Sequence, residues 1–137
     1  MTPPPSLPPP RIRDCMTRDL VTLAPVTEIN RAMQILLDKR ISGAPVLDGN
    51  GFLVGVLSKK DCLRAALQAS YWRDWGSTVA DHMTRDPETL PADMDIVSAA
   101  EAFLASPYRR FPVLDQGQLV GQVSRADILR ALVAHWG

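Results

Sequence analysis

The pattern Ser-x-x-Asp, which combines a hydroxyl with a carboxylate, occurs twice in this 137-residue chain. One copy runs from Ser58 to Asp61 within GVLSKKD, and the other runs from Ser124 to Asp127 within GQVSRAD. At the start of a helix this spacing forms a capping box, in which the hydroxyl and the carboxylate accept hydrogen bonds from backbone N–H groups. The same turn could instead bind a ligand, because free helix N–H groups suit a phosphate and a carboxylate can accept both hydroxyls of a ribose. The pattern alone leaves capping and ligand binding open.

The two Ser-x-x-Asp patterns belong to an internal repeat. The word MTRD occurs at 16–19 and again at 83–86, and the strand sequence PVLD follows in each copy, at 45–48 and 112–115. Between them, apolar residues at positions i, i+3, i+4, i+7 and i+8 predict two matching amphipathic helices. These residues are Ile29, Ala32, Met33, Leu36 and Leu37 in the first copy and Ile96, Ala99, Ala100, Phe103 and Leu104 in the second. Each copy is therefore predicted to fold as strand, helix, hairpin and helix.

Three local details accompany the repeat. Thr27 and Asp93 are reasonable N-caps for the two helices, because a side-chain oxygen there could accept a hydrogen bond from a free N–H group. Beyond the PVLD strands both copies read LVG, at 53–55 and 119–121, but the offset between copies changes there from 67 to 66 residues. The missing residue is expected in or next to the hairpin turn, where a change of length costs least.

The repeated motifs resemble those of cystathionine-β-synthase (CBS) domains. GVLSKKD and GQVSRAD are similar to the G-h-x-[ST]-x-x-[DN] signature of that family, and TVADHMT and the weaker RIRDCMT are similar to its V-x-D-h-M-T opening. The resemblance runs from about Arg11 to Val133. It implies an α+β fold of two βαββα CBS repeats packed about a pseudo-twofold axis. We predict repeats over 14–70 and 71–137. A disordered tail is predicted over 1–13, because six of the twelve prolines lie in its first ten residues.

The resemblance also implies two ligand clefts between the repeats. In the family, each cleft combines the Ser-x-x-Asp of one repeat with the opening segment and the start of the PV strand of the other. Carried across, cleft A would comprise Val56, Ser58, Asp61, Met83, Thr84, Asp86, Tyr108, Arg109, Arg110 and Phe111. Cleft B would comprise Met16, Thr17, Asp19, Ile41, Ser42, Gly43, Ala44, Gln122, Ser124 and Asp127. For the MTRD words an alternative stays open, in which the methionines are core residues and the arginines are solvated.

The two predicted clefts differ in charge. Arg109 and Arg110 precede the second PV strand, whereas Ser42 and Gly43 precede the first. Paired guanidinium groups can bind a polyphosphate through charge-assisted hydrogen bonds. Cleft A is therefore expected to prefer a di- or triphosphate.

Composition and charge exclude several classes of function. The formal net charge is zero, which argues against nucleic-acid binding, and no apolar run approaches the length of about 18 residues that a membrane span needs. Cys15 and Cys62 form no CxxC pair, His82 and His135 have no metal-ligand spacing, and no nucleophile–base pair or phosphate-transfer loop is present. We therefore expect a cytoplasmic protein that is not an enzyme, requires no cofactor and binds no metal, nucleic acid or membrane.

The leading hypothesis is a non-catalytic regulatory or sensor module. It would bind an adenosyl ligand (AMP, ADP or ATP) in the clefts between its repeats and act on a separate partner protein that the sequence does not name. The resemblance further implies a homodimer, and the aromatic segment YWRDWG at 71–76 is a candidate for its surface. The alternative is a structural dimerisation or protein-interaction module whose clefts are empty.

Overall fold

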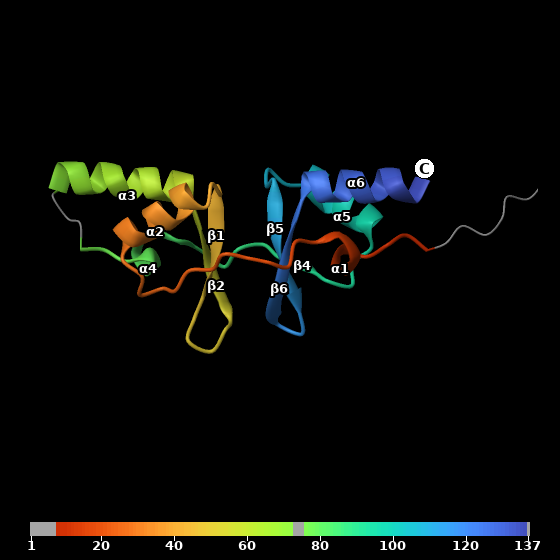
Figure 1. Ribbon diagram of the computed structural model, residues 1–137, viewed down its shortest axis with the longest axis horizontal. Coiled ribbons are helices and arrows are strands. Elements are labelled where there is room, and N and C mark those ends of the chain that lie inside the picture. Colours follow the sequence, from red (N-terminus) through yellow and green to blue (C-terminus); the bar gives the residue numbers. More distant parts are fainter. Residues whose placement is uncertain (1–7, 73–75, 137) are drawn as a thin grey trace, which may run out of the picture. The chain divides into compact units, whose positions relative to one another are not determined.

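The computed structural model describes residues 8–72 and 76–136 as two compact units, each with its own hydrophobic core. The unit that we call central comprises residues 20–87. The unit that we call terminal comprises the chain up to residue 19 together with the chain from residue 88 onward. Each unit thus combines segments of both sequence repeats, and the helices of each unit lie on one side of its sheet (Figure 1). No described helix is long and apolar enough to cross a membrane.

The central unit contains a sheet in the order β1-β2-β3, in which both pairs of neighbours are antiparallel. Its elements are α2 (Ile29–Asp38), β1 (Gly43–Leu47), β2 (Leu53–Ser58), α3 (Lys59–Trp72), α4 (Val79–His82) and β3 (Thr84–Arg85). The predicted apolar face of the first helix is buried at Ile29, Ala32 and Leu36, where it meets strand residues such as Val46 and Leu57. The 3.6-residue spacing thus places this helix against the sheet.

The terminal unit repeats the order of helix, hairpin and helix, but its third strand lies beside the first strand of the hairpin and not the second. Its elements are α1 (Ile12–Cys15), β4 (Leu90–Pro91), α5 (Ile96–Leu104), β5 (Arg110–Asp115), β6 (Gln118–Ser124) and α6 (Arg125–Trp136). The sheet order is β4-β5-β6, with β4 parallel and β6 antiparallel to β5. Both hairpins change register at the same place, between Val46 and Leu47 and between Val113 and Leu114. The predicted α+β fold of two repeats is confirmed.

The two hairpins differ at their turns, as the change of offset predicted. The terminal hairpin closes through Gln116 and Gly117 at φ 51° and 80°, the left-handed pair of a type I′ turn. The central hairpin uses the longer loop 48–52, in which the Asp48 carboxylate accepts hydrogen bonds from the backbone N–H groups of Asn50 and Phe52 at 2.9 and 3.0 Å. The length difference therefore lies where it disturbs neither sheet.

Each MTRD word pairs with a strand of the other sequence repeat. Thr84 pairs with Val56 on β2, and Thr17 exchanges two backbone hydrogen bonds with Gln122 on β6, at 2.8 and 2.9 Å. A glycine lies beneath each methionine. A Cβ atom on Gly55 would lie 2.6 Å from the sulfur of Met83, and the terminal unit repeats this contact between Gly121 and Met16. The close approach explains why the Met-Thr word and the glycine occur together in both copies.

Three local expectations are corrected. The tail predicted over 1–13 extends too far, because Ile12 is wholly buried in the terminal core and its N–H group donates to the carbonyl oxygen of Met94. Helix α2 follows Glu28 and has no side-chain cap. Helix α5 is capped by Asp95, which accepts from the N–H group of Ser98, and not by the predicted Asp93. Residues 1–7 of the predicted tail and positions 73–75 of the aromatic segment lie outside the two described ranges.

Candidate functional site

Both Ser-x-x-Asp patterns form capping boxes at the junction of a strand and a helix. In the central unit the Ser58 N–H group donates to Asp61 Oδ2 at 2.9 Å, and the Asp61 N–H group donates to Ser58 Oγ at 3.1 Å. In the terminal unit Ser124 and Asp127 make the same two bonds at the same distances. Each serine ends a strand and each aspartate lies in the first turn of the helix that follows. The predicted local geometry is confirmed in both copies.

The two aspartates are unusual in their burial. Within residues 8–72 and 76–136, Asp61 and Asp127 are the polar or charged residues that are buried, with 5% and 9% of their surface exposed. A buried carboxylate is costly unless it is paired and hydrogen-bonded. Both are paired one turn later, where Arg64 approaches Asp61 Oδ1 at 3.2 Å and Arg130 approaches Asp127 Oδ1 at 2.6 Å. The sequence analysis missed these arginines, although the repeated Asp-x-x-Arg spacing was the signal that could have found them.

The central unit brings the predicted opening segment to the capping box. Thr84 lies opposite Val56, and the preceding residue, Met83, packs on Gly55. The start of β1 is also adjacent, because the Lys59 N–H group at the start of α3 donates to the carbonyl oxygen of Ser42 at 2.8 Å. The unit thus holds on neighbouring elements the predicted residues Ile41, Ser42, Gly43, Ala44, Val56, Ser58, Asp61, Met83, Thr84 and Asp86.

The terminal unit gathers its residues in the same way. Arg110 lies opposite Ser124 in the β5–β6 register, and the Arg125 N–H group donates to the carbonyl oxygen of Arg109 at 3.1 Å. The unit holds the predicted residues Met16, Thr17, Asp19, Tyr108, Arg109, Arg110, Phe111, Gln122, Ser124 and Asp127. The Phe111 side chain belongs to the core and packs on Phe103, with ring centroids 4.8 Å apart. Packing in the core therefore explains the presence of an aromatic residue at position 111.

Each unit supplies the Ser-x-x-Asp pattern and the opening segment of one predicted cleft, the central unit for cleft A and the terminal unit for cleft B. The remaining members of cleft A, 108–111, belong to the terminal unit, and the remaining members of cleft B, 41–44, belong to the central unit. Their membership in these clefts stays a prediction.

The arginines of the two MTRD words have a structural partner. The Arg18 guanidinium donates to the carbonyl oxygen of Arg13 at 3.0 Å, and the Arg85 guanidinium donates to the carbonyl oxygen of Ala80 at 3.3 Å. Each carbonyl belongs to the short helix that precedes the word, where carbonyl groups lack helical partners. Met16 and Met83 are half-buried against the two cores. Much of the repeated word is therefore explained by packing and backbone hydrogen bonds.

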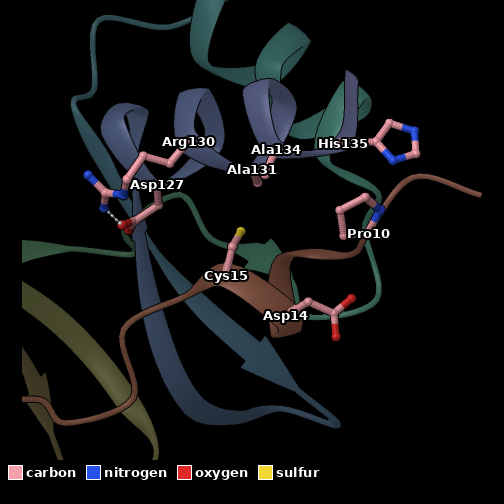
Figure 2. Close-up of a pocket in the computed structure, with 8 residues that line it drawn as sticks. All are labelled: Pro10, Asp14, Cys15, Asp127, Arg130, Ala131, Ala134 and His135. Atoms are coloured by element: carbon pink, nitrogen blue, oxygen red, sulfur yellow. Dashed lines mark hydrogen bonds and ion pairs between the residues drawn. The ribbon is translucent and has the colours of Figure 1, made fainter. Parts of the chain in front are cut away.

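A groove of about 520 Å³ adjoins Asp127 in the terminal unit. Figure 2 shows the Cys15 side chain pointing from α1 toward α6, with the Asp127–Arg130 pair at one end of the groove and His135 at the other. Burial raises the pKa of the Cys15 thiol, and the nearby Asp127 carboxylate raises it further. This thiol is therefore not activated as a nucleophile. Within the described ranges 8–72 and 76–136, no group of three or more His, Cys, Asp or Glu side chains is placed to hold a metal ion.

Comparison with known proteins identifies the class to which this fold belongs. The family model described as CBS domain matches residues 12–68 and again residues 79–134. The chain therefore belongs to the CBS domain family, and it carries two copies of the domain.

Two solved structures in complex with adenosyl compounds are similar to this chain. A crystal structure of CBSX2 in complex with AMP matches with a TM-score of 0.80 and 32% identity, over 93% of this chain and 98% of that one. The CBS domain pair of protein MJ0100, in complex with 5′-methylthioadenosine and S-adenosyl-L-methionine, matches with a TM-score of 0.76 and 26% identity over the same shares.

Full-length relatives are longer than this chain. The chloroplastic CBSX2 protein of Arabidopsis thaliana is 29% identical over 148 residues, which include 88% of this chain and 62% of that protein. The chain also spans 44% of the MJ1225 protein of Methanocaldococcus jannaschii, to which it is 26% identical.

Proposed function

We propose that this chain is a non-catalytic regulatory module that binds an adenosyl ligand, with AMP, ADP or ATP as the candidates, and acts on a separate partner protein. One observation carries the proposal: in both units a buried carboxylate lies in the first turn of a helix, beside a strand and an opening segment that the family motif predicts. The similar CBSX2 structure with AMP and the MJ0100 structure with adenosyl compounds support this ligand class.

The proposed roles follow from the chemistry of each group. Asp61 and Asp127 accept hydrogen bonds from the ribose hydroxyls, because a carboxylate offers about four lone-pair positions, of which the cap and the arginine use two. The dipoles of α3 and α6 favour a phosphate at the helix starts, although the N–H groups of their first and third residues already have partners in the neighbouring carbonyls and the capping serines. Arg109 and Arg110 are exposed cations next to the start of α6 and suit further phosphate groups. The proposed function needs no reaction step.

A ligand screen with matched variants tests this function. AMP, ADP, ATP and S-adenosylmethionine are each added to the protein, and the midpoint of thermal unfolding is measured. We expect at least one ligand to raise the midpoint, since ligands that bind the folded state stabilise it. Asp61→Ala and Asp127→Ala together should abolish that rise. Asp81→Ala is the control, because Asp81 closes a similar capping box with Thr78 on α4 but lies on an exposed turn.

The control variant should keep the full ligand-induced rise. If none of the four ligands changes the midpoint, or if the double variant responds as the control does, the proposed function is wrong.

A second candidate function, dimerisation or protein interaction with empty clefts, is favoured by the apolar surface of α3 and α6. Leu63, Leu67 and Tyr71 lie four residues apart on α3 and are exposed, and Leu129 and Val133 repeat this pattern on α6. Exposed apolar side chains at helical spacing are typical of an interface. We therefore propose a homodimer that uses these faces, under either function.

Sedimentation at micromolar concentration tests the dimer. The unchanged protein should have twice the mass of one chain, and Leu63→Gln with Leu129→Gln should give a monomer. A monomeric mass for the unchanged protein would contradict the proposal.

A further inference from the structure

Each buried aspartate divides its two oxygens between two tasks. Oδ2 accepts the cap N–H group of Ser58 or Ser124, whereas Oδ1 accepts the guanidinium of the arginine one turn later. The carboxylates are buried, but 56% of the Arg64 side chain and 72% of the Arg130 side chain are exposed. The arginine is therefore the partner that can move, because its long side chain is free to rotate toward solvent.

In the absence of a ligand, the ion pair with arginine stabilises the buried carboxylate. An unpartnered carboxylate in a buried site carries a large desolvation cost, and a guanidinium at Oδ1 offsets it. A ribose hydroxyl that donates to Oδ1 must share that oxygen with the guanidinium or displace it. A displaced guanidinium then gains a new partner only if the ligand itself carries an anion.

The position of the arginine places it near such an anion. Arg64 and Arg130 lie one turn after the aspartates, and helical side chains lean toward the N-terminus of their helix. Their guanidinium groups therefore lie over the first turn, as their contacts with the aspartates show (Figure 2 for Arg130). The dipole of the same helix start favours a phosphate, although the N–H groups of the first and third helical residues already have partners. The arginine can thus pass from the carboxylate to the phosphate with a change of side-chain rotamer.

We propose that Arg64 and Arg130 determine ligand specificity, by opposing neutral adenosyl ligands and favouring phosphorylated ones. This inference rests on the proposed function, because it concerns the same two carboxylates. A neutral nucleoside must break or weaken the ion pair and leaves the guanidinium without a partner. A nucleotide breaks the same pair but provides a phosphate in its place.

Calorimetric titration with two probes, AMP and adenosine, tests the proposal. In the variant Arg64→Gln with Arg130→Gln, AMP should bind about tenfold more weakly, because a hydrogen bond between charged groups is lost. Adenosine should bind as tightly as before or a few-fold more tightly, because the guanidinium no longer competes for Oδ1. The ratio of the two affinities should therefore fall by tenfold or more.

Two further variants separate this role from a general effect of charge. Arg64→Lys with Arg130→Lys keeps the positive charge but loses the forked geometry, so part of the preference for AMP should return. Lys60→Gln removes an exposed cation from the same turn without touching the aspartate pair, so the ratio should stay unchanged.

The outcomes are distinguishable. Equal changes for AMP and adenosine in the glutamine variant, or an equal loss of AMP preference in Lys60→Gln, would overturn the inference and leave the proposed function standing. If the unchanged protein binds neither probe, both the inference and the binding of AMP are wrong.

Discussion

Replacing Gly55 with alanine should destabilise the central unit, because this glycine allows the opening segment of the second repeat to dock on β2. A Cβ atom at this position would lie 2.6 Å from the sulfur of Met83, 2.9 Å from its Cγ atom and 2.9 Å from the carbonyl oxygen of Thr84. Overpacking of this kind costs up to about 3 kcal/mol. Alanine recovers about 1 kcal/mol relative to glycine in a strand, so the net loss should be about 2 kcal/mol.

Thermal unfolding followed by circular dichroism measures this loss. At roughly 4 °C per kcal/mol, the midpoint should fall by about 8 °C. Gly49→Ala is the matched control, since a Cβ atom on Gly49 would meet nothing within 4 Å and the midpoint should hardly change. Adding Met83→Ala to Gly55→Ala should cost less than the sum of the two single changes, because the sulfur contact has been removed. If Gly55→Ala is as stable as the control, the close packing of Met83 on Gly55 is not the reason for a glycine at this position.

Three further predictions concern charge. Arg110→Ala should weaken ATP binding, measured by calorimetry, about tenfold more than adenosine binding. Combining this change with Asp61→Ala or with Asp127→Ala will identify the carboxylate that is coupled to Arg110. The sequence predicts Asp61, and additive losses with Asp61→Ala would contradict that prediction. The hydrogen bond from the backbone N–H of Ser98 lowers the pKa of Asp95, so its stabilising effect is present above the ordinary value of about 3.9 and is lost as the pH falls through the lower folded value. Urea unfolding of Asp95→Asn should therefore depend less steeply on pH below about 4, and an unchanged slope would refute this assignment. Burial raises the pKa of both Cys15 and Cys62, so mass spectrometry should find slow alkylation by iodoacetamide at pH 7, and rapid modification of either thiol would contradict it.

The repeat made most of the fold predictable from the sequence. Two copies of one pattern determined the order of the helices and hairpins. The change of offset between the copies, from 67 to 66 residues, located the turn that differs. The capping boxes were predictable because they depend on residues three positions apart. These are local signals, and the structure contains all of them.

Features that depend on contacts between distant segments were harder to predict. Asp93 appeared to be a suitable cap for α5, but it forms ion pairs with Arg11 and Arg13, and Asp95 provides the cap. The proline-rich composition at the start of the chain gave no sign that Ile12 enters the terminal core. For the arginines of the MTRD words the sequence leaves ligand contact and a solvated position open, whereas their observed partners are backbone carbonyls of the preceding helices.

Calorimetric titration with AMP is the decisive experiment on whether the two buried aspartates bind an adenosyl ligand. The protein should bind AMP saturably, and Asp61→Ala with Asp127→Ala should show no binding heat while Asp81→Ala binds as the unchanged protein does. Equal binding of AMP by the unchanged protein and the double aspartate variant would contradict the account.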